Sequence, residues 1–159
     1  MKRLLLLLIM CFASMILLGF DSNDTNLKLK DVEVTIIKSE RVLRYDFTIK
    51  NQGKSRVGGN QDYPGHHHLS LNIAVRPNSS LADHMEMEKD TKYKKMVYRG
   101  GGGSVVLKPG EEGQFHAEYQ MKIKESQDTD FENVKQKALD GTLIIMDGVK
   151  VMAEIPLNK

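Results

Sequence analysis

Three consecutive histidines, His66 to His68, are the residues whose type and spacing most suggest chemistry in this chain. They follow a turn-like Tyr-Pro-Gly triplet and open an alternating stretch that reads "HHHLSLNIAV". Residues two apart on a strand project from one face, with Cα atoms roughly 6.6 Å apart, so His66 and His68 could share a metal ion. Zinc usually takes at least three protein ligands, so this pair alone predicts only a weak site.

Further ligands could come from the polar segment "HMEMEKDTKYKKM", which follows this stretch. Its histidine stands directly before two methionines, and imidazole combined with the soft sulfur of a thioether suits copper. If the segment folds back onto the strand, these groups would form a site for copper or, as a second choice, for zinc. The candidate metal ligands are therefore His66, His68, His84, Met85 and Met87.

The start of a strand explains the same histidines without any metal. Extending the alternation backwards places His67 in line with the inward residues Leu69, Leu71, Ile73 and Val75. His66 and His68 then lie on the solvent side, and methionines in a loop commonly cover the edge of a core. The pattern favours this interpretation, so we expect a protein without a cofactor.

The other motifs do not indicate catalysis. The segment "RGGGGS" lacks the Lys-Ser/Thr ending and the following helix of a phosphate-binding loop, so we expect a flexible hairpin loop there. Asp128 and Asp130 flank an expected helix start, where acidic side chains favour the helix dipole. No serine stands in a nucleophile-elbow context. We therefore expect that the protein is not an enzyme.

The N-terminus has the pattern of a secretory signal. Lys2 and Arg3 precede an unbroken apolar run, residues 4–20, and the polar stretch "DSNDTN" follows at once. The run is just long enough to span a bilayer, and neither candidate cleavage site, after Gly19 or after Ser22, has a small residue at −3 as well as at −1. We expect residues 1–20 to be a signal peptide or an N-terminal membrane anchor and residues 21–26 to be a polar linker. The product would be exported, to the extracellular space or the cell envelope.

The remaining residues, 27–159, suit one domain that binds no nucleic acid. Without residues 1–20 the chain loses two basic residues and no acidic one, which leaves 21 of each. No basic excess remains to neutralise phosphates. The single cysteine, Cys11, lies inside the apolar run, so the domain has no disulfide and depends on its own core.

Strict alternation of apolar and polar residues dominates this domain. It is clearest in "VEVTII" (32–37), "RVLRYDFTIKN" (41–51) and "GQFHAEYQMKIK" (113–124), and a period of two predicts half-buried strands. We expect two sheets to bury between them Phe47, Ile49, Leu71, Ile73, Phe115 and Tyr119.

Two local signals complete the expected secondary structure. In "TDFENVKQKALDG", Thr129 and Glu132 form a capping box and Gly141 ends the helix. In "GTLIIMDGVKVMAEIP", Asp147-Gly148 suits the type I′ turn of a closing hairpin.

Two longer motifs carry a family resemblance. "YDFTIKNQGKS" followed by "VVLKPGEEGQFHAEYQMKI" resembles the immunoglobulin-like accessory domains of bacterial exported and cell-surface proteins, over about residues 27–156. In those domains a strand ends in Asn-x-Gly, and a Pro-Gly-Glu turn precedes a strand across the sandwich. The resemblance implies an all-β, antiparallel Ig-like β-sandwich with one short helix. The long segment after Pro77 and the helix at 129–139 depart from the family pattern.

Such domains bind other molecules, act as spacers or present neighbouring domains, and they rarely catalyse reactions. We therefore expect an exported binding or accessory domain that acts at the bacterial cell surface. Its partner would be a protein or a cell-envelope polymer, with membrane contact only through the N-terminal segment. An extracytoplasmic copper or zinc protein is the alternative, and an inhibitor of extracellular proteases is a third possibility.

Overall fold

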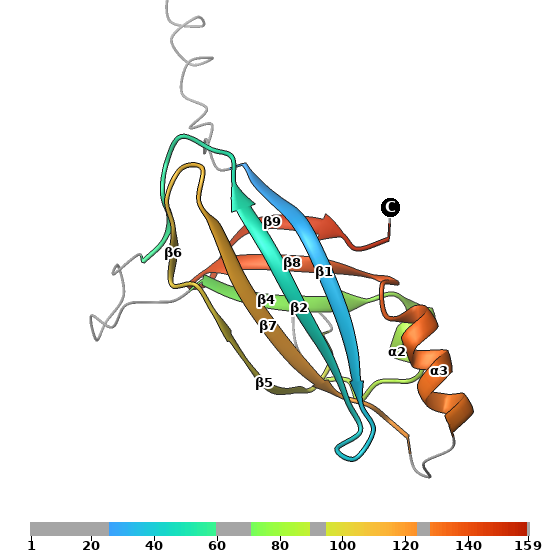
Figure 1. The fold of residues 1–159 in the computed structure, drawn as a ribbon. Helices are drawn as coiled ribbons and strands as arrows, with labels where there is room; N and C mark the ends of the chain where they lie inside the picture. The colour runs from blue at the N-terminus through green and yellow to red at the C-terminus, as the bar shows by residue number, and fades with distance from the viewer. Residues whose placement is uncertain (1–25, 60–70, 90–94, 124–127, 159) are drawn as a thin grey trace, which may run out of the picture.

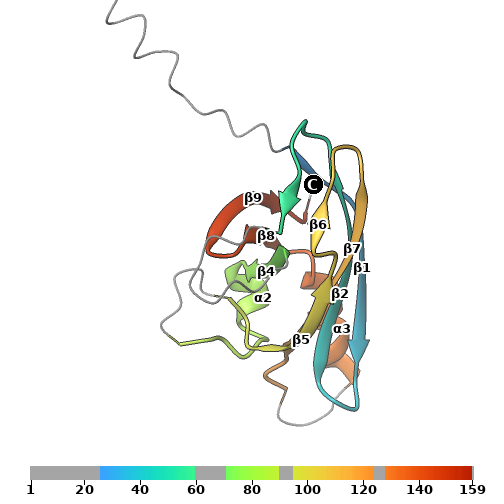
Figure 2. The same ribbon diagram turned by 90° about the vertical axis from the view of Figure 1, so that its left-hand side faces the viewer.

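The computed structural model describes residues 26–59, 71–89, 95–123 and 128–158, which form two facing antiparallel sheets (Figure 1). The four-stranded sheet has the order β1-β2-β7-β5, and the three-stranded sheet has the order β4-β8-β9. Figure 2 shows them as separate layers. The predicted all-β, antiparallel class is therefore confirmed.

The four-stranded sheet consists of β1 (Leu27–Ile37), β2 (Val42–Asn51), β7 (Glu112–Gln120) and β5 (Tyr98–Gly103). The three-stranded sheet consists of β4 (Leu71–Pro77), β8 (Gly141–Asp147) and β9 (Lys150–Pro156). The remaining elements are the short strand pair β3 (Val57–Gly58) and β6 (Val106–Leu107), with the helices α2 (Ser79–Ala82) and α3 (Asp128–Lys137).

The core lies between the two sheets, where the alternating strands direct their apolar residues. Phe47, Ile49, Phe115 and Tyr119 are buried in it, as predicted, and Leu71 joins them from β4. Ile73 is only half-buried, although Leu71 and Val75 on the same face of β4 are buried, because its side chain lines a groove at the molecular surface.

Two buried tyrosine hydroxyls connect the layers of the molecule. The Tyr45 hydroxyl on β2 donates to the carbonyl oxygen of Ala138, just after α3, at 2.6 Å. The Tyr119 hydroxyl on β7 accepts a hydrogen bond from the Val75 N–H of β4 at 2.9 Å. Each bond satisfies a buried polar group that would otherwise be costly to desolvate.

The Asn-x-Gly motif is a turn held by one buried side chain. The Asn51 Nδ2 donates to the carbonyl oxygens of Ser55 and Leu107, at 2.8 and 3.0 Å. Its Oδ1 accepts from the Gly53 N–H at 2.9 Å, and its backbone carbonyl accepts from the Gly110 N–H of the Pro-Gly-Glu turn at 2.7 Å. The two motifs quoted for the resemblance therefore meet at one end of the four-stranded sheet.

Both local predictions at the C-terminal end need correction. Helix α3 begins at Asp128, so Thr129 lies inside it, where the acidic first turn favours the dipole. The closing hairpin turns at Gly148 and Val149, because Asp147 pairs with Lys150. Only Gly148 of this pair has a positive φ, 60°, which is the pattern of a type II′ turn rather than type I′.

No helix in the part of the chain that the structure describes is both long and apolar enough to cross a membrane. The expected signal segment, residues 1–20, lies outside the described residues.

Candidate functional site

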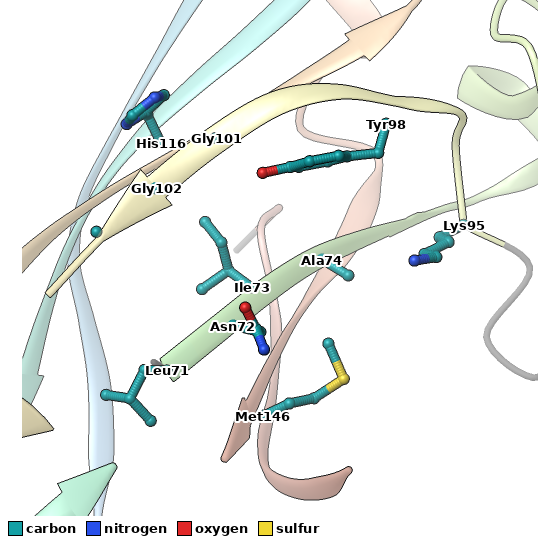
Figure 3. A pocket seen from close by; sticks show the side chains of 11 residues that line it. Leu71, Asn72, Ile73, Ala74, Lys95, Tyr98, Gly101, Gly102, His116 and Met146 are labelled. Carbon is teal, nitrogen blue, oxygen red and sulfur yellow. The ribbon is translucent and has the colours of Figure 1, made fainter. Parts of the chain in front are cut away.

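A groove of about 500 Å³ lies between the edge strands of the two sheets, β5 above and β4 below in Figure 3. Among the described residues each of these strands pairs with only one neighbour in its sheet, so the groove follows the edges of both sheets. The described residues that line it are Leu71, Asn72, Ile73, Ala74, Lys95, Tyr98, Gly101, Gly102, Gly103, His116 and Met146.

The upper wall is a glycine strand, which corrects the expectation of a flexible loop. Gly100 to Gly103 belong to β5 and pair with β7, from Glu118 to Phe115. A Cβ on Gly101 would collide with the Tyr98 hydroxyl, and one on Gly103 would collide with the Phe115 ring. Glycine is therefore required at these positions because aromatic side chains occupy the space beneath the strand.

Tyr98 forms the aromatic surface of the groove. Its ring lies under β5 with the hydroxyl directed along the glycines, and Ile73 points up from β4 on the opposite side (Figure 3). The ring packs edge-on against Tyr119 with centroids 6.2 Å apart, yet the residue stays 48% exposed. A ligand in the groove could therefore contact both an aromatic and an aliphatic side chain.

Alternate residues of β5 direct their backbone N–H and C=O groups away from β7. The Ser104 N–H donates to the Gln114 carbonyl, and residues of an antiparallel pair alternate in direction, so Gly102 also faces β7. Gly101 and Gly103 must then direct their N–H and C=O groups toward the outer edge. Both glycines are exposed.

At the outer edge of β4, two backbone N–H groups already donate hydrogen bonds within the fold. The Leu71 N–H donates to the Val105 carbonyl at 3.3 Å, and the Val75 N–H donates to the Tyr119 hydroxyl. The same alternation directs Ile73 to this edge, and its N–H has no partner among the described residues.

The described lining carries positive or neutral groups and no carboxylate. Lys95 stands at the end of the groove near Tyr98, and its Nζ lies 3.4 Å from Glu88 Oε2. His116 stands at the opposite side of β5, on the outer face of the four-stranded sheet.

The carboxylates on that outer face are held by Arg44. It donates to both carboxylate oxygens of Asp46, at 2.9 and 2.7 Å, and to Glu118 at 3.0 Å. The hydrogen bonds from Arg44 keep the pKa of Asp46 below its usual range. Asp46 and Glu118 are therefore engaged with Arg44, and Glu88 is the carboxylate that pairs with Lys95.

The predicted metal ligands are not brought together among the described residues. Met85 is buried, and its backbone forms an isolated β-bridge with that of Met121. Met87 forms a β-bridge with Met96 and packs against the core. His84 is half-buried, with its Nε2 2.9 Å from the Lys137 Nζ.

His66 and His68 lie outside the described residues, so the metal site stays a prediction. Within the described ranges, no three His, Cys, Asp or Glu side chains form a group that could hold a metal ion.

The groove therefore offers backbone hydrogen-bonding groups, aromatic and aliphatic side chains, and a lysine at one end. These groups suit binding of an elongated ligand. Sequence reasoning identified Ile73 as inward-facing but missed the glycine strand and Tyr98, because the alternation signal is absent from four consecutive glycines. No family model, curated protein or solved structure matches this chain.

Proposed function

We propose that this protein is an exported, non-enzymatic binding domain that acts at the bacterial cell surface or in the cell envelope. Its partner is a protein or a cell-envelope polymer. The groove between β4 and β5 is the observation that carries this proposal, because it is the larger of the two described hollows and combines exposed backbone groups with exposed side chains.

The order of the strands supports an immunoglobulin-like fold for this domain. If β1, β2, β4, β5, β7, β8 and β9 are lettered A to G, the sheets have the orders A-B-E-D and C-F-G. This is the arrangement of a constant-type immunoglobulin domain. The fold by itself does not define a ligand, since function depends on the site that it supports.

The N-terminal sequence supports export. A basic start, an apolar run and a polar exit are the features that the export machinery recognises. Residues 21–159 carry 21 basic and 21 acidic residues, and this balance argues against nucleic acid as the partner.

A comparison of two matched variants tests the proposal. The full chain, solubilised in mild detergent, is used to capture partners from the envelope fraction of its own host. Ile73→Asp places a charge in the groove, and Ile155→Asp makes the same change at a half-buried position on β9, at the other edge of that sheet.

We expect one partner to be retained by the wild type and by Ile155→Asp but lost with Ile73→Asp. Thermal unfolding must show that both variants are folded. Retention of the same partner by all three chains, or of none by the wild type, would overturn the proposed site.

A further inference from the structure

We infer that the groove binds an extended, acidic polypeptide segment, which pairs as an added strand with the outer edge of β5. This inference rests on the proposed binding function and specifies its partner. Addition of a strand to an exposed sheet edge is a general mode of peptide recognition, in which backbone hydrogen bonds supply affinity.

The edges of the two sheets differ in how well side chains protect them. Edge strands usually carry charged residues or proline, which discourage pairing with another chain. β1 carries Lys28, Lys30, Asp31 and Glu33, and β9 carries Lys150, Glu154 and Pro156. β5 carries one charged residue, Arg99, followed by four glycines without side chains.

β5 provides hydrogen-bonding groups in the geometry that a strand requires. Gly101 and Gly103 are two residues apart, and each directs an N–H and a C=O toward the outer edge. β4 is the poorer edge, because the N–H groups of Leu71 and Val75 already have partners. An incoming strand would therefore pair with β5 and place alternate side chains against Tyr98 and Ile73.

Charge determines the chemistry of that strand. The ionisable residues of the described lining are Lys95, Tyr98 and His116, with no aspartate or glutamate among them. Arg99 lies in the same strand edge, next to Tyr98. A carboxylate on the bound segment would complement Arg99 and would compete for Lys95 with Glu88, whose Oε2 lies 3.4 Å from the Lys95 Nζ.

A peptide selection with the full chain tests the inference. The probe is a phage-displayed library of random twelve-residue peptides, and enriched sequences are synthesised for calorimetry. Two versions of each peptide are N-methylated, one at the even and one at the odd positions. The version in which the methylated amides face β5 should bind at least about tenfold more weakly, and the other version should bind almost as well as the unmodified peptide.

Two lysine variants test the charge. Lys95→Gln should weaken binding of the acidic peptides about three- to fivefold. Lys28→Gln, the same change on the exposed surface of β1, should leave it unchanged.

Enrichment of acidic sequences with this N-methylation pattern would support the inference. Failure to enrich any peptide, or binding that is indifferent to N-methylation and to Lys95→Gln, would overturn it. In that case, capture of an envelope partner that is lost with Ile73→Asp would still support the proposed function. If the selection enriches no peptide and the wild-type chain also captures no envelope partner, the proposed function is overturned as well.

Discussion

At the scale of single residues, the buried tyrosines make stability depend on alkaline pH. Burial raises the pKa of Tyr45 and of Tyr119 above the ordinary tyrosine value, which is near 10. Above pH 10 the unfolded chain releases these protons while the folded chain keeps them. The stabilisation is therefore complete below pH 10 and is lost as the pH rises.

Tyr45→Phe separates this effect from the hydrogen bond. At pH 7 the variant should lose about 1–3 kcal/mol, because the buried Ala138 carbonyl loses its donor. Above pH 10 its free energy of unfolding should fall less steeply than that of the wild type, by about 1.4 kcal/mol per pH unit. Urea unfolding at several pH values measures both.

Tyr98→Phe is the matched control, because Tyr98 is half-exposed and lies outside the buried core. Removal of the hydroxyl of this exposed residue should leave the free energy of unfolding at pH 7 close to that of the wild type. An equal slope for Tyr45→Phe and the wild type would show that the Tyr45 hydroxyl does not resist ionisation in the folded state.

At the scale of elements, β5 depends on glycine on one face only. Gly101 and Gly103 lie over the aromatic side chains of the interior, whereas Gly102 faces outward beside His116. A Cβ on Gly102 would be 3.4 Å from the His116 Cε1, an ordinary contact. The strand should therefore tolerate side chains on its outer face but not on its inner face.

Alanine substitution on the two faces of β5 checks this. Gly101→Ala should cost about 1–3 kcal/mol, because Tyr98 or the backbone must move. Gly102→Ala should be neutral or should stabilise by up to about 1 kcal/mol, since it restricts the unfolded chain. The urea midpoints of the two variants give the comparison, and equal midpoints would contradict the packing described for β5.

At the scale of the whole molecule, we propose separate tasks for the N-terminal segment and the folded domain. The described residues from 26 onward form the sheets and their core, and the apolar run precedes them. We therefore propose that residues 1–20 direct export and that the domain carries the binding function.

A fusion of residues 1–20 to a reporter that is active only outside the cytoplasm tests this division. We expect activity, and replacement of Lys2 and Arg3 by glutamate should reduce it, because the basic end orients the segment. An intact fusion that stays inactive would contradict export. N-terminal sequencing of the exported chain distinguishes a cleaved signal from an anchor.

The sequence by itself determined the elements whose signal is local. The period of two along β2 and β7 is visible within each segment, and so is the spacing that puts Phe131 and Val134 on one helix face. These elements could therefore be predicted without knowing which other segments they pack against. The buried positions of Phe47 and Phe115 followed from the same pattern.

Only the tertiary structure decided the features that depend on pairing between distant segments. Four glycines have no side-chain pattern, and they form a strand because β7 pairs with them. Met85 is buried in the core, where its backbone pairs with that of Met121, 36 residues later. The groove exists because the edges of two different sheets, β4 and β5, face each other, and no local sequence pattern encodes that relation.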